Sequence, residues 1–134
     1  MSDAATSSSA SASGAAIRAS DPACLFCRIV AGEIPAARVH EGAAVIGIRD
    51  IAPRAPTHVL FLSRQHIASA AELTVADGPL LGQLFGAAAD FARAEGLTEA
   101  GYRMVTNVGE WGGQTVGHLH VHLLGGRAMA WPPG

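Results

Sequence analysis

Residues 117–124 alternate histidines with aliphatic residues, in the order Gly117-His118-Leu119-His120-Val121-His122-Leu123-Leu124. This alternation is typical of a β-strand, because successive side chains of a strand point to opposite faces of the sheet. The three histidines therefore share one face, and we expect a helix to cover the aliphatic face. An imidazole can act as a nucleophile, base, acid or metal ligand near neutral pH. The pattern alone leaves three interpretations open: phosphate chemistry, a metal site, or a structural role.

A glycine-rich segment comes directly before this predicted strand. Its small and hydrogen-bonding members are Asn107, Gly109, Gly112, Gly113, Gln114 and Thr115. Glycines let backbone N–H groups approach a phosphate closely and form an anion-binding nest, and the side chains of Gln114 and Thr115 add further donors. A glycine-rich loop alone is weak evidence, because most such loops are simple turns. Its position before three histidines on one strand face favours phosphate chemistry.

The composition indicates one globular domain. The chain has 134 residues, of which 49% are hydrophobic and 15% are charged, so it can bury a core of its own. The net charge is −2 and the basic residues are not clustered, which argues against a nucleic-acid partner, whereas a few donors in one pocket can bind a mononucleotide. We expect no transmembrane helix and no membrane partner, since no run of 18 apolar residues occurs.

Residues 1–20 consist mostly of Ala, Ser and Gly. Because this segment has almost no large apolar side chains to bury, we expect a disordered tail, followed by one domain over residues 21–134. The tail lacks the apolar core of a secretory signal and fits a transit peptide poorly. We therefore expect a cytoplasmic protein.

Apolar spacing and the positions of glycine and proline predict the secondary structure. Helices are expected over residues 24–31, 68–73 and 77–95, with Gly96 ending the last one. Strands are expected over residues 37–41, 43–49, 58–62, 102–108 and 118–124, with a hairpin around Gly42. Residues 50–57 are expected to form a loop, since they include two prolines. Because strands and helices mix without a regular βαβ rhythm, the sequence predicts an α+β domain with an antiparallel sheet.

The chain resembles the histidine-triad (HIT) superfamily in motifs that extend from Cys24 to the end. Residues 118–124 match its signature, in which three histidines alternate with apolar residues. Residues 26–35 resemble its opening helix, residues 49–53 together with 55–58 its nucleoside-pocket segment, and residues 112–116 its phosphate loop. Residues 125–127 and the terminal Trp131-Pro132-Pro133-Gly134 are similar to the histidine-triad nucleotide-binding (Hint) branch.

The resemblance implies a HIT-like α+β fold with an antiparallel sheet and helices packed on it. It implies a two-fold homodimer with one continuous sheet, in which Trp131 reaches toward the neighbouring subunit's site. It also implies a purine nucleoside phosphoramidase, which is a hydrolase that releases AMP and an amine from P–N bonded adenylates. The chemistry expected from it needs no catalytic metal.

The same resemblance implies roles for individual residues. His120 aligns with the nucleophile, which would form a covalent adenylyl-histidine while a backbone carbonyl holds its Nδ1–H. His118 and His122 complete the catalytic histidines, Thr115 would pass a proton to the departing amine, and His58 would support the site. The other positions that align with nucleotide contacts are Asp50 and Ile51 for the nucleoside, Asn107, Gly113, Gln114, Thr115 and His122 for the phosphate, and Leu25, Phe26, Ile29 and Ile48 for the base.

Cys24 and Cys27 are the only cysteines. Their CxxC spacing suits zinc, whose usual ligands include thiolates, although two more ligands are needed. The resemblance implies that His66 and His118 supply them at a structural zinc site. The alternative is that both cysteines are ordinary core residues of a helix, and a redox pair is less favoured without a thioredoxin-like βαβ context.

Other functions from the same residues stay open. A related chemistry is hydrolysis of dinucleoside polyphosphates or nucleotidyl transfer to an acceptor, and the terminal Trp131-Pro132-Pro133-Gly134 favours the phosphoramidase over it. A different class is a non-catalytic zinc-binding adaptor that senses a nucleotide. The intact triad and Thr115 argue against an adaptor, because a pure binder needs no free nucleophile.

Overall fold

The computed structural model describes residues 18–134, so most of the predicted tail, residues 1–17, lies outside the described residues. The elements in chain order are α1 (Leu25–Val30), β1 (Arg38–Glu41), β2 (Val45–Arg49), β3 (Thr57–Ser63), the 3-10 turns η1 (Ala70–Glu72) and η2 (Val75–Asp77), α2 (Gly78–Ala94), β4 (Tyr102–Val105), α3 (Gly109–Gly112) and β5 (His120–Gly125).

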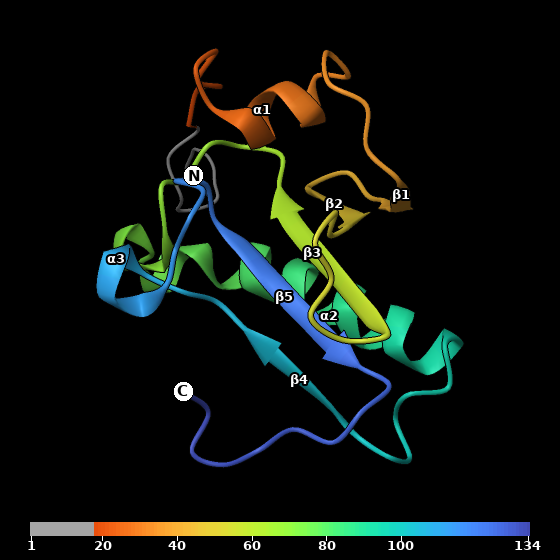
Figure 1. The fold of residues 1–134 in the computed structure, drawn as a ribbon. Coiled ribbons are helices and arrows are strands. Elements are labelled where there is room, and N and C mark those ends of the chain that lie inside the picture. Colours follow the sequence, from red (N-terminus) through yellow and green to blue (C-terminus); the bar gives the residue numbers. More distant parts are fainter. Residues whose placement is uncertain (1–17) are drawn as a thin grey trace.

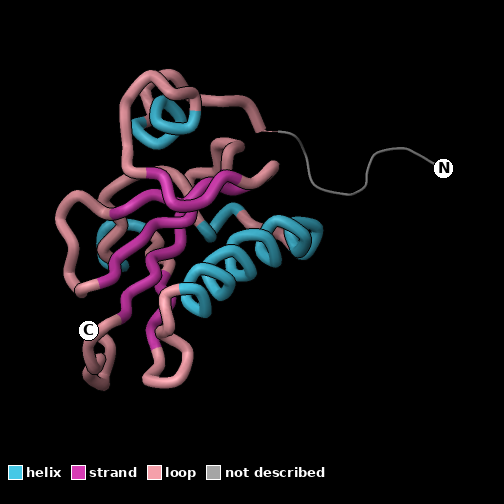
Figure 2. Tube along the Cα trace, turned by 90° about the vertical axis from the view of Figure 1, so that its right-hand side faces the viewer, coloured by secondary structure: helices cyan, strands magenta, loops and turns pink. Residues whose placement is uncertain are grey.

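The strands form one antiparallel sheet in the order β1-β2-β3-β5-β4. The long helix α2 runs along one face of this sheet, and α1 lies at the end where β2 and β3 meet (Figures 1 and 2). The predicted α+β fold with an antiparallel sheet is therefore confirmed. Among the described residues, none of the helices is both long enough and apolar enough to cross a bilayer.

The two faces of the sheet bury separate apolar clusters. On the α2 face, Leu119, Val121 and Leu123 pack with the buried side of the helix, as the alternating pattern predicts. On the other face, aliphatic residues of β2 and β3 pack against α1. His120 and His122 are paired in register with Leu62 and Leu60 of β3, so β5 presents these two imidazoles on the α1 side.

Strand β5 starts two residues later than predicted, and β4 ends three residues earlier. The N–H of His118 bonds to the carbonyl of Val116 at 2.9 Å, and the N–H of Leu119 bonds to Ile67 at 2.6 Å. Both donors are therefore used outside the sheet ladder, and His118 lies ahead of the strand. The last register pair between β4 and β5 is Val105 with His122, which leaves residues 106–108 as a loop.

The other elements follow the sequence closely. The hairpin around Gly42 is present, the predicted loop ends at residue 56 because Thr57 already belongs to β3, and Gly96 follows α2 with a φ of +73°. The predicted helix over residues 68–73 is reduced to a 3-10 turn, and the glycine-rich loop contains the short α3. Gly47 is required by packing, because a Cβ there would lie 2.9 Å from the Phe61 ring.

The described end of the predicted tail contacts the domain. The Arg18 guanidinium bonds to both carboxylate oxygens of the buried Asp77, at 2.9 and 3.2 Å, and the Arg18 N–H bonds to the Gln65 side chain. The Arg18 guanidinium holds the pKa of Asp77 below its usual value. Within the described residues, contacts with the domain thus include Arg18, which lies before the predicted boundary at residue 21.

Candidate functional site

His120 is buried and held by the main chain of its own strand. Its Nδ1 lies 2.6 Å from the carbonyl oxygen of His118, so Nδ1 carries the proton and donates to that oxygen. The Nε2 atom is then left with a free lone pair. The Phe26 ring meets the imidazole edge-on, with centroids 5.1 Å apart. This is the tautomer that the sequence analysis expects of a nucleophile.

His122 is held by a chain of hydrogen bonds that begins at a backbone amide. The Arg54 N–H donates to His58 Nδ1 at 3.0 Å, so the proton of a neutral His58 is on Nε2. His58 Nε2 lies 2.9 Å from His122 Nδ1, which must then accept. As a result, the proton of His122 is on Nε2, where it can be donated to a ligand.

Burial keeps these imidazoles neutral at physiological pH. Desolvation, together with the neighbouring His120 and His58, lowers the pKa of His122 to about 4. Burial also lowers the pKa of His120 and of His58 below the ordinary value. His58 Nε2 lies 3.5 Å from an Asp50 carboxylate oxygen, and because His58 is neutral this contact is no ion pair.

His118 lies in a different environment from the other two histidines of the motif. Its Nε2 donates to the Ser63 carbonyl at 2.7 Å, and its Nδ1 lies 3.3 Å from Cys24 Sγ and 3.6 Å from Cys27 Sγ. His66 Nδ1 lies 3.3 Å from Cys27 Sγ. The predicted direct catalytic role of the His118 side chain is therefore not supported, because the turn before β5 aims the imidazole at the cysteines.

The four predicted zinc ligands come together in the fold. One ligand atom from each of Cys24, Cys27, His66 and His118 lies within 4.8 Å of the others. Two thiols and two imidazole nitrogens form a zinc donor set, and the Ser63 carbonyl fixes the His118 tautomer so that its Nδ1 lone pair faces the thiols. The donors present thus fit zinc, whereas the alternative of two ordinary core cysteines leaves the converging nitrogens unexplained.

A cavity of about 410 Å³ opens beside His122. Its lining residues are Asp50, Ala52, Arg54, His58, Val105, Asn107, Gly113, Thr115, His122 and Leu124. Five of the predicted nucleotide-binding residues are in this set. Gly113 adopts a φ of +87° at the end of α3, a conformation that favours glycine.

Several predicted contacts lie elsewhere. The Gln114 side chain is used within its own loop, since Nε2 donates to the carbonyls of Ala68 and Val116 and Oε1 accepts from Gly109. It has no N–H left for a phosphate, which corrects the expectation of a side-chain donor there. Ile51 and Trp131 are exposed on the single chain. His120 does not line this cavity and faces the apolar cluster on α1 instead.

The predicted base-binding residues gather near α1. Phe26, Ile29 and Ile48 are buried in one apolar cluster, whereas Leu25 is exposed. None of them lines the cavity beside His122. A nucleoside base would therefore contact a different part of the site from the group that fills the cavity.

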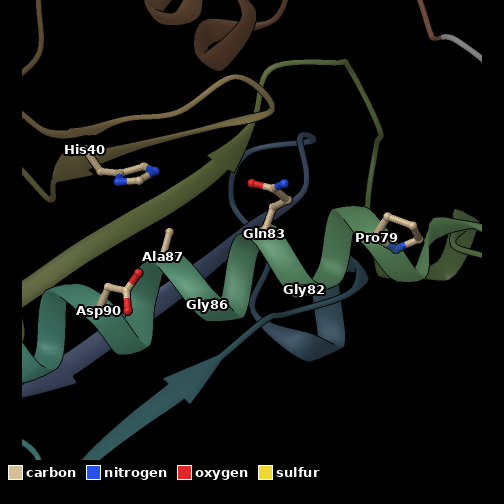
Figure 3. A pocket seen from close by; sticks show the side chains of 7 residues that line it. All are labelled: His40, Pro79, Gly82, Gln83, Gly86, Ala87 and Asp90. Atoms are coloured by element: carbon tan, nitrogen blue, oxygen red, sulfur yellow. The ribbon is translucent and has the colours of Figure 1, made fainter.

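A second candidate metal site and a second cavity are also present among the described residues. Asp50, His58 and His122 have ligand atoms close enough for a metal ion, yet the Arg54 N–H at His58 Nδ1 places the proton on the nitrogen that would bind it. A second cavity of about 490 Å³ lies along α2. Figure 3 shows its lining of His40, Pro79, Gly82, Gln83, Gly86, Ala87 and Asp90, which includes none of the predicted site residues.

Comparison with known proteins identifies the family. The family model described as "HIT domain" matches residues 31–129. The chain belongs to the HIT family. It is 51% identical to an uncharacterized HIT-like protein of Synechococcus elongatus over 82% of this chain and 96% of that protein. It is 44% identical to a 14 kDa zinc-binding protein of Zea mays, over 87% of this chain and 92% of that protein.

A solved structure supports the same assignment. A HIT family hydrolase from Legionella pneumophila superposes with a TM-score of 0.81 at 51% identity, covering 83% of this chain and 99% of that chain. The HIT-like fold predicted from the residue 118–124 motif is thus shown.

Sequence reasoning missed three features of the HIT site. Arg54 and Ala52 line the cavity from the proline-containing loop, in which the motif resemblance gave neither of them a role, and Ser63 orients His118 through its carbonyl. A backbone carbonyl leaves no signal in the residue type. For Arg54, the available signal is a charged side chain between Asp50 and His58, both of which the motif comparison singles out.

Proposed function

We propose that this HIT protein is a hydrolase that cleaves P–N bonded adenylates to AMP and an amine. The observation that carries the proposal is the 2.6 Å hydrogen bond from His120 Nδ1 to the His118 carbonyl, which leaves Nε2 as an uncharged nucleophile. A neutral attacking group is not repelled by the charged phosphate oxygens. Similarity to a protein named as a HIT family hydrolase supports the reaction class.

The reaction takes place in two balanced displacements. His120 Nε2 attacks the phosphorus and a P–N bond forms, while the bond to the leaving nitrogen breaks and its electron pair departs with the amine. The amine takes a proton through the hydroxyl of Thr115, which lines the cavity. Water then attacks the adenylyl-histidine and the His120–phosphorus bond breaks. The proton that the water loses replaces the one that Thr115 passed to the amine, so AMP is released with His120 and Thr115 restored.

His122 stabilises the charge that develops on the phosphate oxygens. The hydrogen-bond chain from the Arg54 N–H through His58 leaves His122 with a proton on Nε2, so the side chain can donate without being charged. Asn107 and Gly113 line the same cavity and would contact the phosphate. His58 is a positioning residue in this scheme, because it acts through His122.

The nucleoside would bind on the α1 side of His120. Phe26 contacts the His120 ring and belongs to the buried cluster with Ile29 and Ile48, which would wall the base, with Leu25 at its edge. Asp50, whose Oδ1 accepts from the Ala52 N–H at 2.8 Å, would accept a ribose hydroxyl near Ile51. We further propose a two-fold homodimer, with the exposed Trp131 reaching the partner's site.

We also propose that Cys24, Cys27, His66 and His118 hold a structural zinc ion. The converging donors support this, as does similarity to a protein named for zinc binding. In this proposal zinc would supply no chemistry to the reaction and would join α1, which contains Cys27 and is capped by Cys24, to the segments that carry the two histidines. The His118 carbonyl that holds His120 belongs to one of these ligands, so the site would also stabilise the nucleophile's geometry.

The test is release of an amine fluorophore from an adenosine 5′-phosphoramidate, comparing wild type with His120→Ala. We expect kcat/KM to fall by roughly 10⁴-fold or more in the variant. The thermal midpoint of both proteins checks the fold. A folded wild type that cleaves diadenosine polyphosphate but not the phosphoramidate would shift the assignment to polyphosphate hydrolysis. Binding of nucleotide without turnover of either substrate would favour a zinc-binding adaptor.

A further inference from the structure

Arg54 is the one cationic side chain that lines the cavity beside His122. Of the ten lining residues, Asp50 is the other one with a full charge, and its carboxylate accepts from the Ala52 N–H. The cavity is lined by residues proposed to contact the phosphate and by none of those proposed to wall the base. Asp50, which is proposed to accept a ribose hydroxyl, also lines the cavity. The space that Arg54 borders therefore lies next to the phosphate and the ribose and away from the base.

The Arg54 main chain is fixed at both of its polar atoms. Its N–H donates to His58 Nδ1 at 3.0 Å, and its carbonyl accepts from Arg127 Nε at 3.0 Å. The positive charge of Arg54 is also close enough to help lower the pKa of His58. The guanidinium is therefore attached to a backbone position that is held in place beside His58 and the cavity.

The Arg54 guanidinium differs from the other arginine side chains of the chain. The sequence has nine basic residues, all of them arginine and all within residues 18–134. Eight have a partner in the described part of the chain, either a carboxylate, a carbonyl or an aromatic ring: Arg18, Arg28, Arg38, Arg49, Arg64, Arg93, Arg103 and Arg127. Within that part of the chain, the Arg54 guanidinium has none, so its donors are available to a ligand.

We propose that Arg54 is a specificity-determining residue that binds a second anionic group of the substrate, carried by the group that leaves the phosphorus. A carboxylate or a further phosphate matches the planar guanidinium, which can give two parallel N–H bonds to either. The inference rests on the proposed function, because it names the leaving group of that same reaction. The preferred substrate is then an adenylate whose leaving group is negatively charged, such as an amino acid joined through nitrogen with its carboxylate free.

The first experiment compares two adenosine 5′-phosphoramidates that differ by one charge, one of alanine and one of alaninamide. The kcat/KM ratio of the two substrates is measured for wild type, Arg54→Gln and Arg54→Glu. We expect wild type to favour the carboxylate by roughly 3- to 10-fold, Arg54→Gln to lose this preference, and Arg54→Glu to reverse it. Arg93→Gln, which removes the same charge from the exposed face of α2, is the matched control and should keep the wild-type ratio.

The second experiment tests a phosphate as the source of the second charge. Dissociation constants of AMP and ADP are measured by calorimetry in the His120→Ala chain, with and without Arg54→Gln, so that no ligand is consumed. If ADP binds more tightly than AMP and Arg54→Gln removes this difference, the group that Arg54 binds is a phosphate. If Arg54→Gln changes only the kcat/KM ratio of the alanine and alaninamide substrates, the group is a carboxylate. The advantage of ADP over AMP should also shrink at high salt.

The outcomes separate this inference from the proposed function. One outcome is that wild type cleaves the alaninamide substrate while Arg54→Gln leaves two quantities unchanged: the kcat/KM ratio of the alanine and alaninamide substrates, and the ratio of the ADP and AMP dissociation constants. That result overturns the Arg54 inference and leaves the phosphoramidase proposal standing. If wild type cleaves neither phosphoramidate, the proposed function fails, and the ADP ratio alone decides whether Arg54 binds a second anion.

Discussion

His118 and His120 stand two residues apart and are both buried, yet they belong to different regions of the molecule. His118 gives its Nε2 proton to the Ser63 carbonyl and presents Nδ1 to two thiols, whereas His120 gives its Nδ1 proton to the His118 carbonyl and keeps Nε2 free. One region is a cluster of zinc-type donors, and the other adjoins His122, which lines the cavity. The nitrogen that a backbone carbonyl holds thus decides what the opposite nitrogen can do.

The largest effect that distinguishes the two regions is expected from Cys27→Ser. This variant removes one of two soft donors, so zinc should fall from about one equivalent per chain to below about a tenth, and the thermal midpoint should fall by roughly 10 °C. Metal analysis of protein purified without chelator and a melting curve measure both. Retention of a full equivalent of zinc by Cys27→Ser would refute the ligand assignment. His58→Ala is the matched variant from the cavity side and should retain zinc.

His58→Ala should lower activity and leave the zinc content unchanged. Without the N–H from His58, the proton of His122 is no longer directed to Nε2, and we expect kcat/KM for the phosphoramidate to fall roughly 10- to 100-fold at unchanged zinc content. His58→Gln, whose amide N–H can approach the place of the imidazole Nε2, should recover part of the loss. Equal activity of His58→Ala and wild type would remove His58 from the mechanism.

The pH profile of kcat/KM tests whether the histidines beside the cavity are neutral at physiological pH. Burial lowers the pKa of His122 to about 4 and also lowers that of His58, so both take up a proton below the ordinary value near 6.5. Activity is therefore fully present above 6.5 and is lost only as pH falls through the lowered values. At pH 5.5 we expect a smaller loss than the roughly tenfold that ordinary histidines would give. An acid limb centred at 6.5 would contradict this.

The alternating motif predicted the family and the face of β5 that packs on α2, because these depend on side-chain period and residue type. The tautomer of His120 was expected only from the role of nucleophile that the resemblance implies. The motif did not separate His118 from the other histidines. The different environment of His118 depends on where strand β5 begins. That point is set by main-chain hydrogen bonds from the His118 N–H to Val116 and from the Leu119 N–H to Ile67. Gln114 was misassigned for a related reason, since carbonyls 2 and 46 residues away take its two N–H groups.

The smallest effect is expected from a substitution of Arg18. Arg18 lies in the segment that leads to Cys24, and its N–H bonds to Gln65, the residue before His66. Arg18→Ala leaves the buried Asp77 without its cation and removes about 2 kcal/mol from the free energy of unfolding, measured by urea titration. The pKa of Asp77 is lowered in the folded state, so the Arg18 contribution is complete above the unfolded value of about 3.9 and declines as pH falls below it. The difference between wild type and Arg18→Ala should therefore be constant from pH 7 to about pH 5 and shrink below about pH 4.

Arg28→Ala is the matched control for that experiment, because its guanidinium meets Glu33 at 3.5 Å on the surface and should contribute less than about 0.5 kcal/mol. Arg18→Ala should weaken zinc binding slightly while leaving the kcat/KM ratio for alanine and alaninamide substrates at its wild-type value, since Arg18 contacts Gln65 and Asp77 and does not line the cavity. A change in that ratio, with zinc unaffected, would mean that the N-terminal segment belongs to the cavity and not to the cysteine cluster.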